Sequence, residues 1–328
     1  MGMKPRKPRP PRRFERGKRG AGPARLAGFR PTKPPPRAPS GPLRVSVVKY
    51  LNTAPLVWGL ERGPLKGRYR LSYTVPAECA EALRHGTADV GIIPSIEYQT
   101  IRGLKIVPGI AIASERKVES VLLVSRGPAR RAKRVALDAS SRTSAALVKI
   151  LFARLWKREP AYTEAAPDLK AMLSANDAAL LIGDPALQFA LKSPAALSSS
   201  PAAPLSRAES RDAAGDLHVY DLAEEWVKLT NLPFVFAFWA ARAEVARAMG
   251  NRVAHDLHTS RDEGMKHIGE IAREAAGRLK LPGGQVERYL RVSIQYRLDA
   301  PHRAGLESFF RFAAEQGLIE KARPLEFL

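Results

Sequence analysis

From residue 43 onward, short apolar runs alternate along the chain with segments in which apolar residues recur at helical spacing. The first run, residues 43–48, predicts a strand, and a short helix is expected from Pro55. Residues 69–75 alternate between apolar and polar positions, which is typical of a strand with one covered face. Residues 88–94 are almost continuously apolar, as in a parallel strand covered on both faces. This alternation predicts βαβ units and therefore an α/β protein.

A second βαβ series begins further along the chain. A strand is predicted over residues 134–138 and leads into a long apolar helix, and residues 178–182 form another continuously apolar run. Asp184 then stands where a helix-capping residue is expected. From residue 242 onward the periodicity is helical. Two α/β lobes with a ligand cleft between them are the simplest arrangement of these two series.

Interruptions of this pattern set the expected domain boundaries. We assign residues 43–120 and 237–328 to a first lobe and residues 121–236 to a second lobe. Residues 193–215 are rich in Ser, Ala and Pro without periodicity, and we interpret them as a disordered insertion in the second lobe. Residues 1–42 combine Pro, Arg, Lys and Gly with very few apolar residues, which predicts a disordered basic tail.

Much of the formal charge of +22 belongs to that tail. Residues 1–42 hold 13 of the 54 Lys and Arg residues and a single acid, Glu15. Such a tail could attract nucleic acid or another anionic surface without specificity, or it could be a non-essential extension. The composition of the whole chain, with 45% hydrophobic and 26% charged residues, is ordinary for a globular protein. Nucleic-acid binding could therefore rest only on the tail.

Further observations narrow the class of protein. Cys79 is the only cysteine, so an intrachain disulfide is impossible and a cytoplasmic location is expected. The N-terminal residues lack the apolar core of a secretory signal, and no apolar run is long enough to span a membrane. No P-loop or Gly-x-Gly-x-x-Gly motif follows a strand, so nucleotide binding has no support. His255, His258, Asp262 and His267 resemble a metal cluster, but their spacing on a polar helix indicates solvated side chains rather than zinc ligands.

Polar residues gather where predicted strands end and helices begin, which is where open α/β sheets bind ligands. At the first such junction, Asn52 and Thr53 could present an amide and a hydroxyl to a ligand or could cap the following helix. The second junction, Ser141-Arg142-Thr143-Ser144, offers three hydroxyls, a guanidinium and the free N–H groups of a helix start. A cap alone would need fewer polar groups, so we predict that this junction binds an anion.

Six segments, in this order, resemble the chorismate dehydratases of the futalosine route to menaquinone. They are Tyr50-Leu51-Asn52-Thr53-Ala54-Pro55, Ala88–Tyr98, Ser120-Val121-Leu122-Leu123, Ala136-Leu137-Asp138 with Ser141–Ser144, Ala179–Asp184 and Leu232–Ala237. The resemblance covers about Leu43 to Phe312. Lys49 departs from it, because the family usually has a small residue before Tyr-Leu-Asn. The basic tail and the segment 193–215 lie outside it.

This resemblance implies a two-lobed, periplasmic-binding-protein-like fold of the second type, used as a cytoplasmic enzyme. The implied enzyme is a hydro-lyase, a carbon-oxygen lyase that converts chorismate to 3-[(1-carboxyvinyl)oxy]benzoate and water without a cofactor. Chorismate is a dicarboxylate with a ring hydroxyl. Helix N-termini, hydroxyl groups and an Arg would suit such a ligand.

The resemblance also implies a role for each residue of the predicted site. Asn52 and Ser95 would be catalytic, because they could orient the departing hydroxyl or stabilise developing charge. The substrate's own enolpyruvyl carboxylate could accept the proton. Glu97 is another candidate base, although a carboxylate at a helix start ordinarily serves the helix. The residues expected to bind the substrate are Tyr50, Thr53, Ser120, Ser141, Arg142, Thr143 and Ser144.

Two alternative functions share this fold. A solute-binding protein for a small carboxylate should be exported, and the missing signal peptide argues against it. The sister enzyme of the same pathway, which makes dihydroxynaphthoate, resembles this chain less over residues 50–55. The expected partner is a small-molecule substrate rather than a membrane or nucleic acid, and the sequence specifies no oligomeric state.

Overall fold

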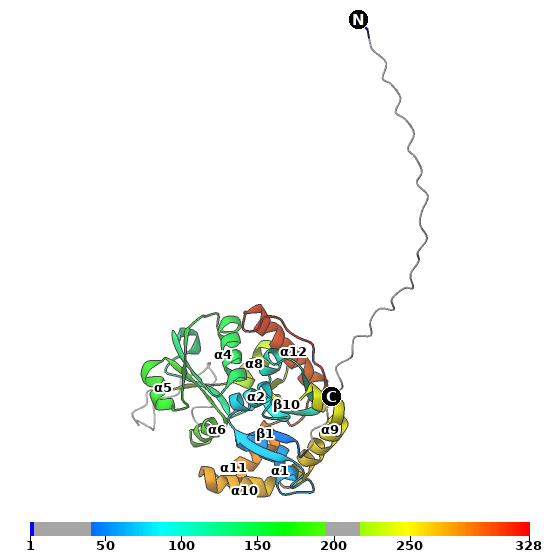
Figure 1. Cartoon of the computed structure of the whole chain (residues 1–328). Coiled ribbons are helices and arrows are strands. Elements are labelled where there is room, and N and C mark those ends of the chain that lie inside the picture. Colours follow the sequence, from blue (N-terminus) through cyan, green and yellow to red (C-terminus); the bar gives the residue numbers. More distant parts are fainter. Residues whose placement is uncertain (3–40, 194–216) are drawn as a thin grey trace, which may run out of the picture. The chain divides into compact units, whose positions relative to one another are not determined.

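The computed structural model describes residues 1–2, 41–193 and 217–328. It confirms the predicted α/β class, because two mixed five-stranded sheets are combined with helices (Figure 1). The predicted disordered tail, residues 1–42, and the predicted disordered insertion, residues 193–215, fall almost entirely outside the described residues. In the described part of the chain, no helix is long and apolar enough to cross a membrane.

The first sheet has the strand order β2-β1-β3-β10-β4. In this sheet β1 pairs in parallel with β2 and β3, whereas β10 runs antiparallel to β3 and β4. The register places Val47 opposite Tyr73 and Phe238 opposite Ile93. The strands are β1 (Arg44–Val48), β2 (Arg70–Thr74), β3 (Val90–Pro94), β4 (Leu104–Ser114) and β10 (Phe234–Arg242).

The second sheet repeats this plan with the order β7-β6-β8-β5-β9. Here β6 pairs in parallel with β7 and β8, and β5 runs antiparallel to β8 and β9. The strands are β5 (Val121–Ser125), β6 (Arg134–Asp138), β7 (Ala161–Ala165), β8 (Ala178–Ile182) and β9 (His218–Asp221). All residues of β5 and β8 are buried, as their apolar sequences predict.

Over the described strands, the chain passes from one sheet to the other twice. The first passage leads from β4 to β5, and the second leads from β9 and helix α8 (Leu222–Thr230) to β10. β10 begins at Phe234, before the boundary expected at residue 237, and its first residues already pair with Ser114 and Ala113 of β4. The assignment of residues to two lobes otherwise stays a prediction.

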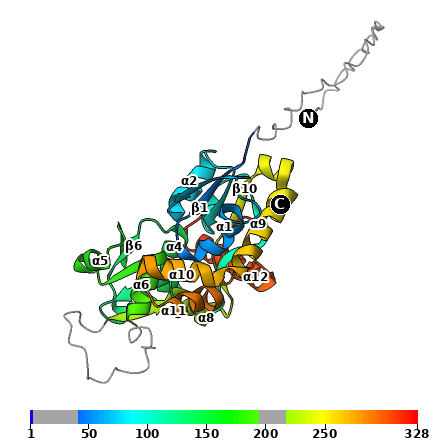
Figure 2. The ribbon, with the colours of Figure 1, turned by 90° about the horizontal axis from the view of Figure 1, so that it is seen from below.

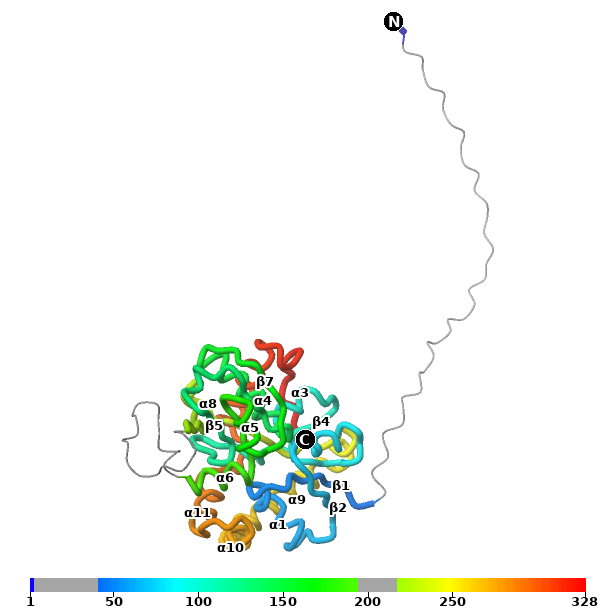
Figure 3. Tube along the Cα trace, turned by 90° about the vertical axis from the view of Figure 1, so that its left-hand side faces the viewer, coloured from blue at the N-terminus to red at the C-terminus, as the bar shows by residue number. Residues whose placement is uncertain are grey.

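Helices connect the strands and form the C-terminal part of the chain. In Figure 2, α1, α2 and α9 lie around the first sheet, and α5 and α6 lie beside the second. The C-terminal helix α12 contacts both β10 and α4, and Figure 3 shows this red segment next to α4. The helices are α1 (Ala54–Glu61), α2 (Pro76–Arg84), α3 (Glu97–Thr100), α4 (Arg142–Arg154), α5 (Leu169–Ala175), α6 (Gly183–Lys192), α9 (Ala243–Lys266), α10 (Ile268–Leu279), α11 (Gly283–Arg288) and α12 (Ala300–Glu315). Short helices are η1 (Leu51–Thr53), η2 (Ala129–Arg131) and the π-helical η3 (Tyr289–Ser293).

Helices α1 and α9 approach each other very closely because small residues lie between them. A Cβ atom built on Gly59 of α1 would come within 2.6 Å of the Cα of Ser260 in α9. The Ser260 hydroxyl donates to the carbonyl of Leu56 at 2.8 Å. Since α1 follows directly after η1, this packing sets the position of the segment that carries Asn52.

The stability of the first sheet should depend on pH through one carboxylate. Asp89, just before β3, accepts hydrogen bonds from the backbone N–H of Arg44 at 2.8 Å and from its guanidinium at 2.6 and 3.0 Å. Burial alone would raise the pKa of Asp89, but these bonds and the Arg44 charge outweigh burial and lower it. A carboxyl whose pKa is lower in the folded protein than in the unfolded chain stabilises the fold at pH values above its unfolded pKa of about 3.9. This stabilisation is lost as the pH falls through the pKa that the carboxyl has in the folded protein.

We therefore expect the free energy of unfolding of the wild-type protein to fall below about pH 4 more steeply than that of Asp89→Asn. Urea titrations of both proteins from neutral pH to about pH 2.5 would measure the difference. If the free energy of unfolding depended on pH in the same way in both proteins, Asp89 would not be the group responsible for the loss of stability in acid.

Candidate functional site

A cavity lies between the ends of strands from both sheets. Its walls are mostly apolar, with a few polar side chains, which is typical of a small-molecule site. Among the described residues that line it, none is charged. The first sheet and the segments next to it supply Val48, Tyr50, Asn52, Pro76, Pro94, Ile112, Phe236 and Ala237. The remaining lining residues belong to the segment 118–183, which contains β5, β6 and β8 of the second sheet, and are Val118, Val121, Ser141, Thr143, Ser144, Ile182 and Gly183.

Asn52 reaches this cavity because β1 ends at Val48 and the chain turns into η1. The alternative that Asn52 or Thr53 caps the following helix is not supported, since neither η1 nor α1 has a side-chain hydrogen bond at its N-cap. The Thr53 hydroxyl instead donates to the Asn52 Oδ1 at 3.4 Å. Thr53 is itself buried and does not line the cavity, so it lies behind Asn52 rather than facing a ligand.

Tyr50 lines the cavity and is half-buried. Its hydroxyl lies 3.4 Å from the Ser140 Oγ, and the Ser140 hydroxyl donates to Asp138 at 2.7 Å. Burial raises the pKa of the Tyr50 phenol and that of the Asp138 carboxyl. The contact joins the two sheets, because Tyr50 follows β1 and Ser140 follows β6. It orients the Tyr50 ring at the wall of the cavity.

The N-terminus of α4 forms a polar wall of the cavity. Ser141 is the N-cap residue without a side-chain cap bond, and Thr143 and Ser144 lie in the first turn. All three line the cavity, as predicted for the second junction. The first N–H groups of a helix have no partner within the helix and carry its positive partial charge. This wall is therefore suited to bind an anion through neutral groups.

Ser95 lies one layer behind the cavity. Its side chain is fully buried, and its hydroxyl donates to the Val235 carbonyl at 2.8 Å. The Ser95 Oγ also lies 3.3 Å from the hydroxyl of Thr143, which accepts the N–H of Ile96 at 3.1 Å. The structure thus brings Ser95 to the predicted site, but as a residue that holds Thr143 and not as one that faces the cavity.

Ser120 is likewise fully buried and does not line the cavity. It accepts a hydrogen bond of 2.9 Å from the phenol of Tyr289 in η3. Burial raises the pKa of Tyr289, and the side chains of Ser120 and Asn52 act in the opposite direction. Sequence reasoning missed Tyr289, because residues 286–293 show nothing but a continuing helical pattern. The π-helical turn that carries it is a feature often found at functional sites.

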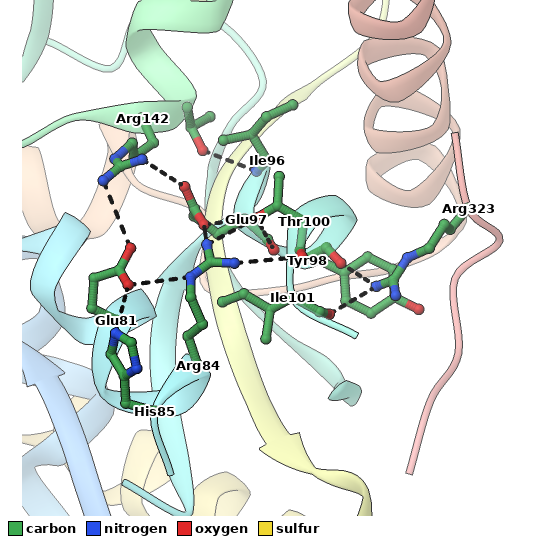
Figure 4. A network of polar contacts seen from close by, with 11 residues as sticks. Glu81, Arg84, His85, Ile96, Glu97, Tyr98, Thr100, Ile101, Arg142 and Arg323 are labelled. Atoms are coloured by element: carbon green, nitrogen blue, oxygen red, sulfur yellow. Dashed lines mark hydrogen bonds and ion pairs between the residues drawn. The ribbon is translucent and has the colours of Figure 1, made fainter. Parts of the chain in front are cut away.

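Arg142 is one of the residues that the sequence predicts to bind the substrate. Its guanidinium does not line the cavity but lies 3.6 Å from Glu97 and 3.7 Å from Glu81 (Figure 4). The physical reason is its helical position, since Arg142 is the first residue of α4 and lies about 100° around the helix from Thr143. Arg142 therefore joins α4 to α2 and α3, and the structure does not support direct binding of a substrate carboxylate by this side chain.

Glu97 is held within the same network of charged groups (Figure 4). Its buried carboxylate accepts hydrogen bonds from Arg84 at 2.5 Å and from Thr100 at 2.9 Å. Like Arg142, it does not line the cavity, so its geometry favours the structural alternative over a role as the base. Lys49, the departure from the family pattern, is exposed and also lies outside the cavity lining.

His258 and His267, two of the histidines that resembled a metal cluster in the sequence, contact different parts of the protein. The His258 Nε2 lies 2.9 Å from the Pro108 carbonyl, and His267 stacks on Trp58 with ring centroids 4.8 Å apart. Within the described part of the chain, no group of three or more His, Cys, Asp or Glu residues is placed to hold a metal ion.

Comparison with known proteins decides the family. The family model for menaquinone biosynthesis matches residues 43–315. A curated relative, the chorismate dehydratase of Thermus thermophilus, is 34% identical over 269 residues, which cover 82% of this chain and 94% of the relative. The chain belongs to the chorismate dehydratase family of menaquinone biosynthesis. This confirms the resemblance stated from the sequence segments.

Solved structures show that this member of the family has a periplasmic-binding-protein-like fold. A protein of Archaeoglobus fulgidus matches with a TM-score of 0.62 at 15% identity, covering 84% of this chain and 98% of that chain. The periplasmic aliphatic sulphonate binding protein of Escherichia coli matches with a TM-score of 0.55 at 16% identity, covering 87% and 93%. The alkanesulfonate-binding protein of Xanthomonas axonopodis, solved with MOPS bound, matches with a TM-score of 0.57 at 20% identity, covering 88% and 97%.

Proposed function

We propose that this chain is a chorismate dehydratase, a carbon-oxygen lyase that converts chorismate to 3-[(1-carboxyvinyl)oxy]benzoate and water. The reaction would be an early step of the futalosine route to menaquinone, carried out in the cytoplasm on a free small-molecule substrate. The observation that carries the proposal is the match to the Thermus thermophilus chorismate dehydratase along 82% of the chain. The cavity, which is lined by Asn52 and by the N-terminus of α4, supports it.

The chemistry needs little from the protein beyond placement. Loss of water forms an aromatic ring, and the proton to be lost is acidified because it is vinylogous to the ring carboxylate. The substrate's enolpyruvyl carboxylate is the proposed proton acceptor, so no protein side chain has to act as a strong base. Positioning of the substrate and stabilisation of developing charge then account for the catalysis.

The polar groups of the cavity divide between these tasks. Ser141, Thr143, Ser144 and the free N–H groups of α4 would bind a carboxylate of chorismate through hydrogen bonds and the helix dipole. Asn52, which lines the same cavity, would donate its amide hydrogens to the departing hydroxyl or to the oxygen on which charge develops. Ser95 would act through Thr143, which it contacts, and Tyr289 through Asn52 and Ser120.

Incubation of the purified protein with chorismate, followed by mass spectrometry of the products, tests the proposal directly. A dehydratase gives a product lighter by one water, whereas a solute-binding protein binds chorismate or another carboxylate and returns it unchanged. Absence of the dehydrated product under conditions in which chorismate binds would overturn the proposal. Heat-denatured protein controls for the spontaneous decay of chorismate.

The anion-binding wall makes a separate prediction. Ser144→Ala should raise KM about two- to tenfold and lower kcat less, since the loss of one hydrogen bond is worth roughly 0.5–1.5 kcal/mol and acts on ground and transition states alike. Steady-state kinetics on chorismate would measure both constants. Ser174→Ala is the matched control, because Ser174 is exposed and, among the described residues, its hydroxyl bonds only to the Ala171 carbonyl of its own helix. Equal KM values for the two variants would remove Ser144 from the binding wall.

A further inference from the structure

Asp184 stands at the start of α6, where an Asp would ordinarily cap its own helix. It does not do so, because the N-cap position of α6 is Ile182 and the structure has no side-chain cap bond there. The Asp184 carboxylate instead reaches the other side of the cleft. Its Oδ1 accepts the backbone N–H of Leu51 at 2.8 Å, and its Oδ2 lies 3.2 Å from the Arg278 guanidinium.

Gly183 supports this contact from the neighbouring position. Its φ is +63°, a conformation that favours glycine, and a Cβ built on it would lie 2.7–2.8 Å from three ring atoms of Tyr50. The Tyr50 ring therefore lies against the bare backbone of Gly183. Gly183 and Asp184 thus hold Tyr50 and Leu51, the two residues that come immediately before Asn52, from the side of the second sheet.

The Leu51 N–H is a group that needs a partner from outside its own helix. It belongs to the first residue of η1, and N–H groups at a helix start have no intrahelical acceptor. When the two sheets separate, water would take the place of the Asp184 carboxylate. When they close, an ionised carboxylate replaces that water, and hydrogen bonds to charged acceptors are among the strongest available to a backbone N–H.

We propose that Asp184 is a positioning residue which, by binding the Leu51 N–H across the cleft, fixes the orientation of Asn52 in the closed form. The inference rests on the proposed function, because it assigns Asn52 its role in dehydration. It adds that the active arrangement of Asn52 is completed only when the second sheet reaches the first. Hinge closure that completes a site in this manner is a common device of two-lobed proteins.

The test compares Asp184→Ala with Asp184→Asn and with Asp168→Ala. Asp168 accepts the N–H of Ala171 at 3.0 Å and caps α5, so it has the capping function that Asp184 lacks. Two experiments are made on each variant: NMR measures hydrogen exchange at the Leu51 amide, and steady-state kinetics measures kcat and KM for chorismate. Exchange does not depend on turnover and therefore reports on the Leu51 contact even if chorismate is not the substrate.

Asp184→Ala should speed exchange of the Leu51 amide about tenfold or more and lower kcat/KM by a similar factor, mainly through kcat. Asp184→Asn should retain part of the protection of the Leu51 amide and part of kcat/KM, because its amide oxygen can still accept the hydrogen bond. Asp168→Ala should lower the melting temperature and leave Leu51 exchange and kcat/KM at the wild-type values. If Asp184→Ala does not fold, Asp184→Asn carries the comparison.

Wild-type exchange and kcat/KM in Asp184→Ala would overturn the inference, as would equal effects of Asp184→Ala and Asp168→Ala. Failure of the proposed function is distinguishable, since the wild-type protein would then give no dehydrated product although Leu51 exchange still responded to Asp184.

Discussion

Asn52→Ala is expected to lower the turnover of chorismate by about 100-fold or more, the size of effect that follows removal of one preorganised hydrogen-bond donor. The amide lines the same cavity as the helix start of α4, and its oxygen accepts a hydrogen bond from the Thr53 hydroxyl at 3.4 Å. Single-turnover experiments would measure the chemical step without product release. Substrate binding, measured separately by titration calorimetry, should change much less than turnover.

Asn52→Asp separates this role from a structural one. An ionised carboxylate cannot donate a hydrogen bond and would repel a dianionic substrate, so this variant should also be nearly inactive. If Asn52 served only the fold, Asp would replace it with little loss, since the two side chains are alike in size and in capping ability. A stable and active Asn52→Asp protein would end the catalytic assignment, and melting temperatures of both variants would exclude trivial unfolding.

The regular part of the fold could be predicted from the sequence because the buried strands are apolar throughout. β3 and β8 lie inside the sheets, and their nearly continuous apolar runs identified them in the sequence. β7 was missed because Ala161–Ala165 forms an edge strand with mostly exposed side chains and no alternation of apolar and polar residues. α8 was also missed, although Asp221 caps it through the N–H groups of Ala223 and Glu224. In the structure α8 contacts α4 and the strands β5, β9 and β10, which lie in both sheets.

The sequence located the junctions of the site better than it located individual side chains. Local rules place residues 50–53 and 141–144 at strand ends, and the structure brings both junctions to one cavity. Which residue of a helix start faces that cavity depends on how the helix is rotated, and this rotation turned Arg142 away. Tyr289 and Asp184 depend on tertiary contacts with residues 169 and 133 positions away. No local pattern encodes contacts of that length.

Gly264→Ala is expected to destabilise the protein by about 3 kcal/mol, a large effect for the addition of one methyl group. A Cβ built on Gly264 in α9 would lie 1.9 Å from the carbonyl oxygen of Pro55 in α1, and a backbone atom cannot move away by changing a rotamer. The two helices would have to separate, which would also disturb the Ser260 hydrogen bond to the Leu56 carbonyl. Urea unfolding would measure the change.

Gly277→Ala is the matched control, because Gly277 lies inside α10, is exposed, and has no heavy atom within 4 Å of a built Cβ. The same substitution there should stabilise the protein by about 0.5–1 kcal/mol, since alanine loses less backbone entropy than glycine on folding. Similar changes in the two variants would contradict the proposed close packing of α1 on α9. Because α1 begins two residues after Asn52, any Gly264→Ala protein that folds should also turn over chorismate more slowly than Gly277→Ala. The ratio of their kcat values measures how strongly the packing of α1 on α9 contributes to the position of the Asn52 amide.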